Sequence, residues 1–475
     1  MCPALAAATL SSIASAQVPS ATPYQRQLDL LVTDASFDGV WRCVDWNQDG
    51  DYLDANEVEA FYDESLGTIS LSNNSSISVA PDGTAYVGDS TADIVLAMRD
   101  LNGDGDANDA GEHRVFFDNS NPAGIAMAAM QSLHVDLLGR VYLAIANSGS
   151  TGVDMIVKLE DLNGDGDALD AGEAVDYHTV PGSVSTADSI PTELGAGPDL
   201  NLYYTEAGAS GAISKGVYRL ADNNADGDCN DPGERSLFWD TSTIGAASPF
   251  HWGMAITRDG RFYLSDHSSN ETIWTARDDD NSGTIEASEQ SVFYQTSAST
   301  WWDVVIRDDG SILLCEDQTP DRLVVLTDLN QDGDALDAGE AVEVYNDTQA
   351  VNGGLRPRGA AFMRGPELVA APPSVAIGAS TSFNVTTNKP GELAAIFLAI
   401  SNTGALPIPP YGVLEIGPLN IVTLGVGLSD ANQHFALPFA IPNTPAAIGT
   451  LSAQAWCGDA YRQFLSNPTT VTITP

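Results

Sequence analysis

The stretch DLNQDGDALDAGE, residues 328–340, decides how the rest of this 475-residue chain is organised. Side chains that end in oxygen recur on alternate positions, a glycine stands sixth, and an acid closes the segment. Variants of this stretch occur six times, starting at Asp45, Asp100, Asp161, Asp222, Asp278 and Asp328. By subtraction, successive copies begin 55, 61, 61, 56 and 50 residues apart, and such a period is typical of an array of supersecondary units.

These six segments, called acidic loops one to six in chain order, predict calcium binding. Ca²⁺ takes six to eight oxygen ligands, and a tight turn at the glycine lets one short loop wrap the ion. The fifth copy, residues 278–289, resembles the EF-hand calcium loop, whose ligands come from positions 1, 3, 5, 7, 9 and 12. The other five are one residue longer, with Asn at position 3 and acids at positions 1, 5, 7, 10 and 13. Whether position 10 or position 13 closes the calcium shell stays open.

The predicted ligands are the oxygen-bearing side chains at these positions, for up to six Ca²⁺ ions. They are Asp45, Asn47, Asp49, Asp51, Asp54 and Glu57; Asp100, Asn102, Asp104, Asp106, Asp109 and Glu112; Asp161, Asn163, Asp165, Asp167, Asp170 and Glu173; Asp222, Asn224, Asp226, Asp228, Asp231 and Glu234; Asp278, Asp280, Ser282, Thr284, Glu286 and Glu289; and Asp328, Asn330, Asp332, Asp334, Asp337 and Glu340.

The charge of the chain is concentrated in these loops. There are 65 acids against 19 Lys plus Arg, which gives a net charge of −46. With five acids in each loop, the loops hold 30 of the 65 acids. Six bound Ca²⁺ would bring −46 to −34, so the metal-free chain is expected to repel itself strongly. Nucleic acids and anionic membranes are poor partners for such a surface.

The first residues predict export. Residues 1–16 are read as a signal peptide, because a small, apolar run ends in Ala14-Ser15-Ala16, an A-x-A cleavage signal. No later stretch is long and apolar enough to span a bilayer. Export to the medium or the cell surface also agrees with the loops, since weak extracellular Ca²⁺ sites are filled at millimolar calcium. The four cysteines after the predicted signal peptide are far apart and indicate neither a metal site nor a disulfide framework.

Between the loops the chain has the order of parts expected of a propeller blade. In the second repeat, residues 76–79, 85–89, 93–98 and 114–117 are strand-like, and Pro81-Asp82-Gly83 makes a turn between the first two. The strand flanks differ from the helices that enclose an EF-hand loop. The second strands, such as residues 201–206 and 261–266, resemble those of NHL and YWTD repeats in six-bladed β-propellers, with aromatic residues and a terminal acid. The resemblance covers residues 29–365 and implies an all-β fold, with residues 17–365 as a six-bladed β-propeller.

The two ends of this region are predicted to share one blade. The first loop is preceded by only two strands, residues 30–34 and 40–44, and the missing strand is available at residues 358–363. Such closure removes sheet edges that otherwise invite aggregation. Residues 366–371 are read as a linker. Residues 372–475 carry no acidic loop and have about six or seven strand-like segments, the size of a small β-sandwich.

On the face opposite the loops, the second strands end in a recurring polar residue. These residues are Asp34, Asp89, Asn147, Glu206, Asp266 and Glu316. They are expected to tie the backbones of neighbouring blades together, while the alternative is one catalytic Ca²⁺, as in gluconolactonase-like and paraoxonase-like propellers. His251 and His267 are candidate general bases there. Trp252, Trp301 and Trp302 are a candidate platform for a sugar or are core residues.

The sequence therefore predicts an exported, calcium-stabilised propeller that binds or supports a partner outside the cell, an extracellular carbohydrate or protein. A calcium-dependent hydrolase or lactonase is the main alternative, and a quinone-dependent sugar dehydrogenase is a third. No G-x-S-x-G, P-loop or zinc signature is present, so catalytic residues stay unassigned.

Overall fold

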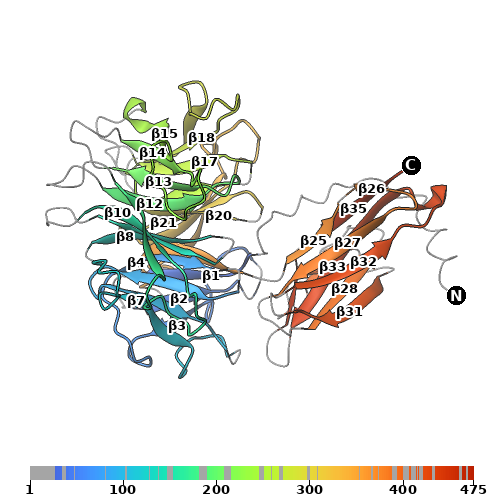
Figure 1. The fold of residues 1–475 in the computed structure, drawn as a ribbon, viewed down its shortest axis with the longest axis horizontal. Coiled ribbons are helices and arrows are strands. Elements are labelled where there is room, and N and C mark those ends of the chain that lie inside the picture. Colours follow the sequence, from blue (N-terminus) through green and yellow to red (C-terminus); the bar gives the residue numbers. More distant parts are fainter. Residues whose placement is uncertain are drawn as a thin grey trace. The chain divides into compact units, whose positions relative to one another are not determined.

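The computed structural model describes residues 27–475 with gaps. The gaps are residues 35–38, 46, 48, 81, 102–103, 128, 137–138, 147–152, 181–189, 208–214, 245–250, 258, 267–270, 297–299, 308, 352–353, 365–366, 373, 388–392, 400–405, 408–412, 415, 417–420, 431–433, 459–462 and 467–468. The predicted signal peptide lies outside the described residues. Apart from two short 3₁₀ turns, η2 (Thr241–Thr243) and η3 (Pro445–Ala447), the described chain is all-β (Figure 1). It divides into two compact units, of which the larger runs from Asp29 to Met363 apart from residues 81–83.

The larger unit contains six antiparallel four-stranded sheets, numbered here in chain order. Sheet 1 comprises β24 (Pro357–Arg364), β1 (Gln27–Asp34), β2 (Gly39–Cys43) and β3 (Val58–Asp63); sheet 2 comprises β4 (Asn74–Val79), β5 (Ala85–Asp89), β6 (Ile94–Met98) and β7 (His113–Asp118); sheet 3 comprises β8 (Met130–Val135), β9 (Val141–Ile145), β10 (Met155–Leu159) and β11 (Ala174–Thr179). Sheet 4 comprises β12 (Pro191–Ala196), β13 (Leu202–Glu206), β14 (Gly216–Leu220) and β15 (Arg235–Asp240); sheet 5 comprises β16 (Met254–Ile256), β17 (Phe262–Asp266), β18 (Thr272–Ala276) and β19 (Gln290–Gln295); sheet 6 comprises β20 (Trp301–Ile306), β21 (Ile312–Glu316), β22 (Arg322–Leu326) and β23 (Ala341–Asn346).

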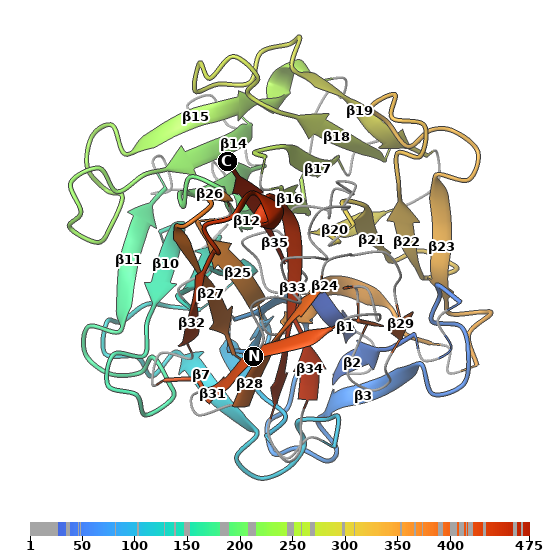
Figure 2. The same ribbon diagram turned by 90° about the vertical axis from the view of Figure 1, so that its right-hand side faces the viewer.

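The sheets follow one another around a ring, which makes this unit a β-propeller (Figure 2). Strands β3, β7, β11, β15, β19 and β23 lie at the periphery of the ring. The core lies between neighbouring sheets: one buried cluster joins Tyr142 and Ile156 of sheet 3 to Leu202 and Tyr204 of sheet 4. The second strands are therefore covered on both faces, and all five residues of Val141–Ile145 are buried. This explains why such strands read as continuous apolar runs and not as alternating ones.

The ring closes as predicted, because the strand after the last repeat completes the first sheet. Strand β24 pairs with β1 at the inner end of sheet 1, 326 residues away in sequence. The Gly359 N–H donates to Thr33 Oγ1 at 2.9 Å. The prediction that the N- and C-terminal segments share one sheet is confirmed.

The smaller unit includes residues 364–475 and contains two main sheets. One comprises β25 (Glu367–Ala371), β27 (Ser380–Thr386) and β32 (His434–Ala440); the other comprises β26 (Ser374–Ala376), β35 (Thr469–Thr474), β33 (Gly449–Gly458), β28 (Leu393–Ala399) and β31 (Val422–Leu428), with β34 (Gln463–Leu465) on β33; a separate pair is β29 (Leu406–Pro407) with β30 (Val413–Leu414). Phe383 and Val385 of the first sheet share one buried cluster with Ile396 and Ala453 of the second.

One boundary predicted from the sequence is wrong. Most of the predicted linker, residues 366–371, is strand β25, which pairs with β27 from Leu368↔Val385 to Ala371↔Ser382. Leu368 and Ala370 are buried, so their alternation is that of a half-buried strand. Among the helices in the described part of the chain, none is long and apolar enough to cross a membrane.

Candidate metal centres

Each acidic loop connects the third strand of its sheet to the fourth. Loop two, for example, connects β6 to β7, and it lies on the same side of the sheet as the turn between β4 and β5, because all four strands are antiparallel. The loops therefore occupy one face of the propeller, as the strand pattern predicts. Among their predicted ligands, Asn102 lies outside the described residues.

The first acid of a loop holds the turn at the glycine. In loop six, the Asp328 carboxylate accepts hydrogen bonds from the Asp332 N–H at 3.2 Å and the Gly333 N–H at 3.0 Å. Gly333 has a φ of +101°, a left-handed conformation that glycine adopts without a Cβ penalty. Equivalent bonds from the sixth residue reach Asp45, Asp100, Asp161, Asp222 and Asp278. The shared framework explains why all six copies keep this acid and this glycine.

The last acid fastens the base of the loop. Glu340 Oε1 accepts from the Leu329 N–H at 2.9 Å, and its Oε2 accepts from the Asp337 N–H at 3.0 Å. The residue is 2 % exposed. Glu57, Glu112, Glu173, Glu234 and Glu289 bond to the backbone of their own loops in the same manner. A predicted ligand is thus also a structural residue.

The asparagine at position 3 connects both halves of the longer loops. Asn330 Nδ2 donates to Asp332 Oδ2 at 3.0 Å and to Asp337 Oδ2 at 2.6 Å. Loops one, three and four repeat this double contact. The acid at position 10 therefore faces the same side chain as the acid at position 5. Desolvation and the nearby carboxylates of Asp165, Glu173 and Asp167 raise the pKa of Asp170.

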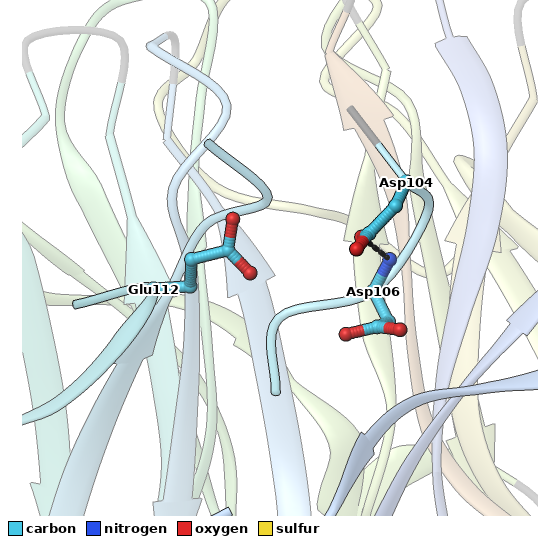
Figure 3. A group of neighbouring side chains, drawn as sticks. All are labelled: Asp104, Asp106 and Glu112. Carbon is cyan, nitrogen blue, oxygen red and sulfur yellow. Dashed lines mark hydrogen bonds between the residues drawn. The ribbon is translucent and has the colours of Figure 1, made fainter. Parts of the chain in front are cut away.

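Among the described residues, groups of three carboxylates converge in loops two and five. In loop two, one oxygen each of Asp104, Asp106 and Glu112 lie within 4.8 Å of one another (Figure 3). The Asp106 N–H also donates to Asp104 Oδ1 at 3.3 Å, which keeps the two acids on one turn. In loop five the group is Asp278, Asp280 and Glu289. A donor set made only of oxygens fits a hard cation such as Ca²⁺ and does not fit a site for a soft metal.

On the opposite face, the terminal acids of the second strands bind backbone. The Asp89 carboxylate accepts from the N–H groups of Asn73, Thr91 and Ala92 at 2.7 to 2.9 Å. Asp34 accepts from the Arg356 N–H at 3.1 Å, and Glu206 from the Ile190 N–H at 2.6 Å. Glu316 pairs with Arg322, and Asn147 lies outside the described residues. These acids have a structural role, but the N–H groups that they bind belong to their own sheet or to the segment that leads into it. The expected tie between neighbouring blades is therefore not what these bonds make.

The histidine and tryptophan candidates differ in burial and in their contacts. His251 is fully buried between Ser265 O and Thr241 Oγ1, and burial lowers its pKa to about 4. His267 lies outside the described residues. Trp301 is a core residue at 1 % exposure. Trp252 and Trp302 are half-buried with ring centroids 5.1 Å apart, and Arg358 lies 4.5 Å over the Trp302 ring.

Two acids on the first strands of sheets 4 and 6 were not found from the sequence. Glu193 of β12 accepts from Ser132 Oγ at 2.5 Å, and Asp303 of β20 accepts from the N–H groups of Val304 and Ala360. Burial raises the pKa of Asp303 to about 6, and burial together with the charge of Asp303 raises that of Glu193. The available signal was an acid inside a short first strand, where the equivalent positions in sheets 2 and 3 carry serine.

Comparison with known proteins gives no family. No family profile and no curated protein matches the chain. Among solved structures, a protein of unknown function from Bacteroides caccae is 13 % identical over 71 % of this chain and 99 % of its own, with a TM-score of 0.42. Streptogramin B lyase is 16 % identical over 62 % and 89 %, with a TM-score of 0.36. YCF48 bound to D1 peptide is 12 % identical over 70 % and 86 %, with a TM-score of 0.34. Likenesses this distant carry no argument about activity.

Proposed function

We propose that the chain is a secreted, calcium-binding, six-bladed β-propeller with a binding or scaffold role outside the cell. The observation that carries the proposal is the hydrogen-bond framework that recurs in the acidic loops. It holds the first and last acids of each loop by backbone N–H groups, as Asp328 and Glu340 illustrate. A framework that orients several carboxylates toward one another has a cost in repulsion, which a bound divalent cation offsets.

A scaffold role is supported by the opposite face. Asp34, Asp89 and Glu206 are each used by backbone N–H groups, and His251 is buried with both ring nitrogens in contact with oxygen. None of these groups resembles a free acid or base that faces a substrate. We therefore assign the acids to holding their own sheets in shape, and the calcium ions to stabilising the loops.

The location and the C-terminal unit belong to the same proposal. Loops of this type bind calcium weakly, and extracellular calcium is concentrated enough to fill them. The acidic surface repels nucleic acid and anionic membranes, so a carbohydrate or another protein is the partner that we propose. Because the two C-terminal sheets share one core, we propose that residues 367–475 form an accessory β-sandwich, which either binds a partner or acts as a spacer.

Calcium titration tests the proposal directly. The full-length protein is freed of metal with a chelator, and bound ions are counted by native mass spectrometry as Ca²⁺ is added. We expect up to six ions, saturation at a free concentration of about 10⁻⁴ to 10⁻³ M, and weaker binding of Mg²⁺, which demands a stricter geometry. Absence of bound ions at millimolar Ca²⁺ would refute the proposal.

A hydrolase or lactonase remains the second candidate, and Glu193 with Asp303 is the observation that favours it. Two carboxyl groups with raised pKa values, one of them raised in part by the charge of the other, are the kind of pair that can divide acid and base roles. Lactone and ester substrates would be screened with the wild-type protein and with Glu193→Gln. Turnover that Glu193→Gln abolishes without a change in bound calcium would favour the enzyme, whereas inactivity of the wild-type protein across the screen would favour the scaffold.

A further inference from the structure

The outer strand of each of the six sheets of the larger unit carries a β-bulge at one equivalent position. In sheet 2 the pairing of β6 with β7 shifts from Val95↔Phe117 to Leu96↔Val115, which leaves Phe116 as the extra residue. The extra residues of the six outer strands are Phe61, Phe116, Tyr177, Phe238, Phe293 and Val344. A bulged residue is left out of the ladder, so its carbonyl group is available to another partner.

That partner is the acidic loop of the next sheet. The carbonyl oxygen of each bulged residue accepts a hydrogen bond from the N–H of the eighth loop residue, at 2.7 to 2.8 Å in all six cases. The donor and acceptor pairs are Tyr52–Val344, Ala107–Phe61, Ala168–Phe116, Cys229–Tyr177, Ile285–Phe238 and Ala335–Phe293. Ala107, Ala168 and Ala335 are completely buried at this contact. Each loop is therefore joined to the preceding sheet as well as to its own.

Side chains strengthen the contact on both sides. In loop four, Lys158 Nζ of sheet 3 donates to Gly227 O at 2.7 Å, and His178 Nδ1 lies 2.7 Å from Cys229 O. The Thr179 N–H donates to Asn230 Oδ1 at 2.8 Å. In loop two, Arg42 of sheet 1 reaches Gly105 O at 3.3 Å. The preceding sheet thus contacts the turn that contains the predicted ligands.

The first loop makes this contact across the closure of the ring. The Tyr52 N–H donates to Val344 O of sheet 6 at 2.7 Å, and the Val351 N–H donates to Leu53 O at 3.0 Å. Strand β24 joins the ends of the propeller at the inner side of sheet 1, whereas loop one joins sheet 1 to the outer strand of sheet 6. The ring is closed at two separate places.

We propose that the acidic loops are inter-sheet latches, in which a cation bound by one loop holds the outer strand of the preceding sheet, and that loop one latches the ring shut. The inference rests on the proposed calcium function for the cation. Its geometric basis is that a predicted ligand shapes the turn around the eighth residue: Asp167 Oδ1 accepts from the Leu169 N–H at 2.9 Å, on either side of Ala168. Without the cation, repulsion between the loop carboxylates spreads this turn and releases the bulge carbonyl.

Hydrogen exchange of the full-length protein tests the latch, because it reports stability strand by strand. Asp165→Ala removes one predicted ligand from loop three. At saturating Ca²⁺ we expect exchange at least tenfold faster in loop three and in β7 of the preceding sheet, with β15 and β19 unchanged. Glu59→Ala, which removes an exposed acid outside the loops, is the control and should leave β7 unaffected.

The outcomes separate the latch from the calcium assignment. Loss of one bound ion with faster exchange only in β10 and β11 overturns the latch and leaves the calcium function intact. Retention of all ions with unchanged exchange counts against Asp165 as a ligand, and so against the proposed function at this loop.

Cys229 provides a second readout that needs no new label site. It is the eighth residue of loop four and is 1 % exposed, and Cys43 and Cys315 are equally buried elsewhere in the propeller. In Asp226→Ala we expect a thiol reagent to modify Cys229 at least tenfold faster than in the wild-type protein, with peptide mapping showing Cys43 and Cys315 unchanged. Equal acceleration at all three cysteines would indicate global unfolding and would overturn a local latch.

Discussion

At the scale of single residues, the acids of a loop differ in what they do. Asp332 is exposed, and its carboxylate accepts hydrogen bonds within its own loop, from Asn330 Nδ2 and the Asp334 N–H. Glu340 is buried, and both of its carboxylate oxygens accept backbone N–H bonds. Similar ligand chemistry at the two positions therefore has different structural consequences.

Asp332→Ala and Glu340→Ala should separate these roles. Each change is expected to lower the bound-calcium count by about one, since one loop holds one ion. In chelator, Asp332→Ala should leave the free energy of unfolding nearly unchanged. Glu340→Ala should lower it, by about 1–3 kcal/mol for each buried N–H that loses its acceptor. Denaturant titration with and without Ca²⁺ measures both effects, and equal losses in chelator would contradict the distinction.

The pH dependence of stability should report Asp303. Burial raises its pKa to about 6 in the folded protein, so the folded state binds a proton that the unfolded chain releases at lower pH. Its contribution therefore falls as the pH rises from about 4 through 6 and is constant above that range.

Asp303→Asn should reduce the loss of thermal stability between pH 5 and pH 7 at saturating calcium. The quantity to compare is the difference in melting temperature across this range, because the substitution also changes contacts with Val304 and Ala360 at every pH. An identical difference in the variant and the wild-type protein would show that Asp303 does not titrate there.

At the scale of elements, the sequence predicted the strands and loops that recur in each repeat, and it missed the contacts that form between different sheets. The strands on either side of loop two and the shared first sheet follow from apolar runs and from counting strands. The latch could not be predicted, because the N–H of Ala168 and the carbonyl group of Phe116 are backbone groups that any residue supplies. Glu193 and Asp303 were missed because the sequence does not show that an acid of sheet 4 lies close enough to an acid of sheet 6 for the charge of one to raise the pKa of the other. Strand β25 was missed because a short segment between the two units reads as a connection.

Removing β24 should open the propeller. A chain that ends at Leu355 loses this strand, and with it the Gly359–Thr33 contact and the Ala360–Asp303 contact. We expect aggregation or loss of cooperative unfolding, because the edge of β1 is left with unpaired backbone groups. A chain that ends at Arg364 keeps β24 and is the control. Calorimetry and size-exclusion chromatography compare the two, and equally sharp unfolding at equal temperature would refute closure by β24.

At the scale of the whole molecule, charge and metal act together. The chain has a net charge of −46, and 30 of its 65 acids lie in loops on one face, so the metal-free protein is expected to be sensitive to ionic conditions. Ligand binding to the folded state alone stabilises by about 2.7 kcal/mol per site at 100 times the dissociation constant. Several filled loops therefore add up to a large share of the stability of an ordinary domain.

Calcium should raise the melting temperature of the propeller by well over 10 °C, and chelator should reverse the change. In chelator, added NaCl should recover part of the loss, since salt screens the repulsion between exposed carboxylates. Differential scanning calorimetry at 50 mM and 500 mM NaCl, with and without Ca²⁺, measures both terms. A melting temperature that is the same with and without Ca²⁺ would exclude a structural role for the metal.

The latch also has a direction, and this bears on how such a chain can grow. Every repeat has a bulge whose carbonyl group accepts from the following loop, and a loop whose N–H donates to the preceding bulge. In sheet 2 the carbonyl group is that of Phe116 and the N–H is that of Ala107. A repeat duplicated in frame would carry both the bulge carbonyl group and the loop N–H that such a contact needs. The new copy could therefore bond to both of its neighbours without any change in the older repeats. The same few backbone atoms thus hold neighbouring sheets together and allow whole repeats to be added by duplication.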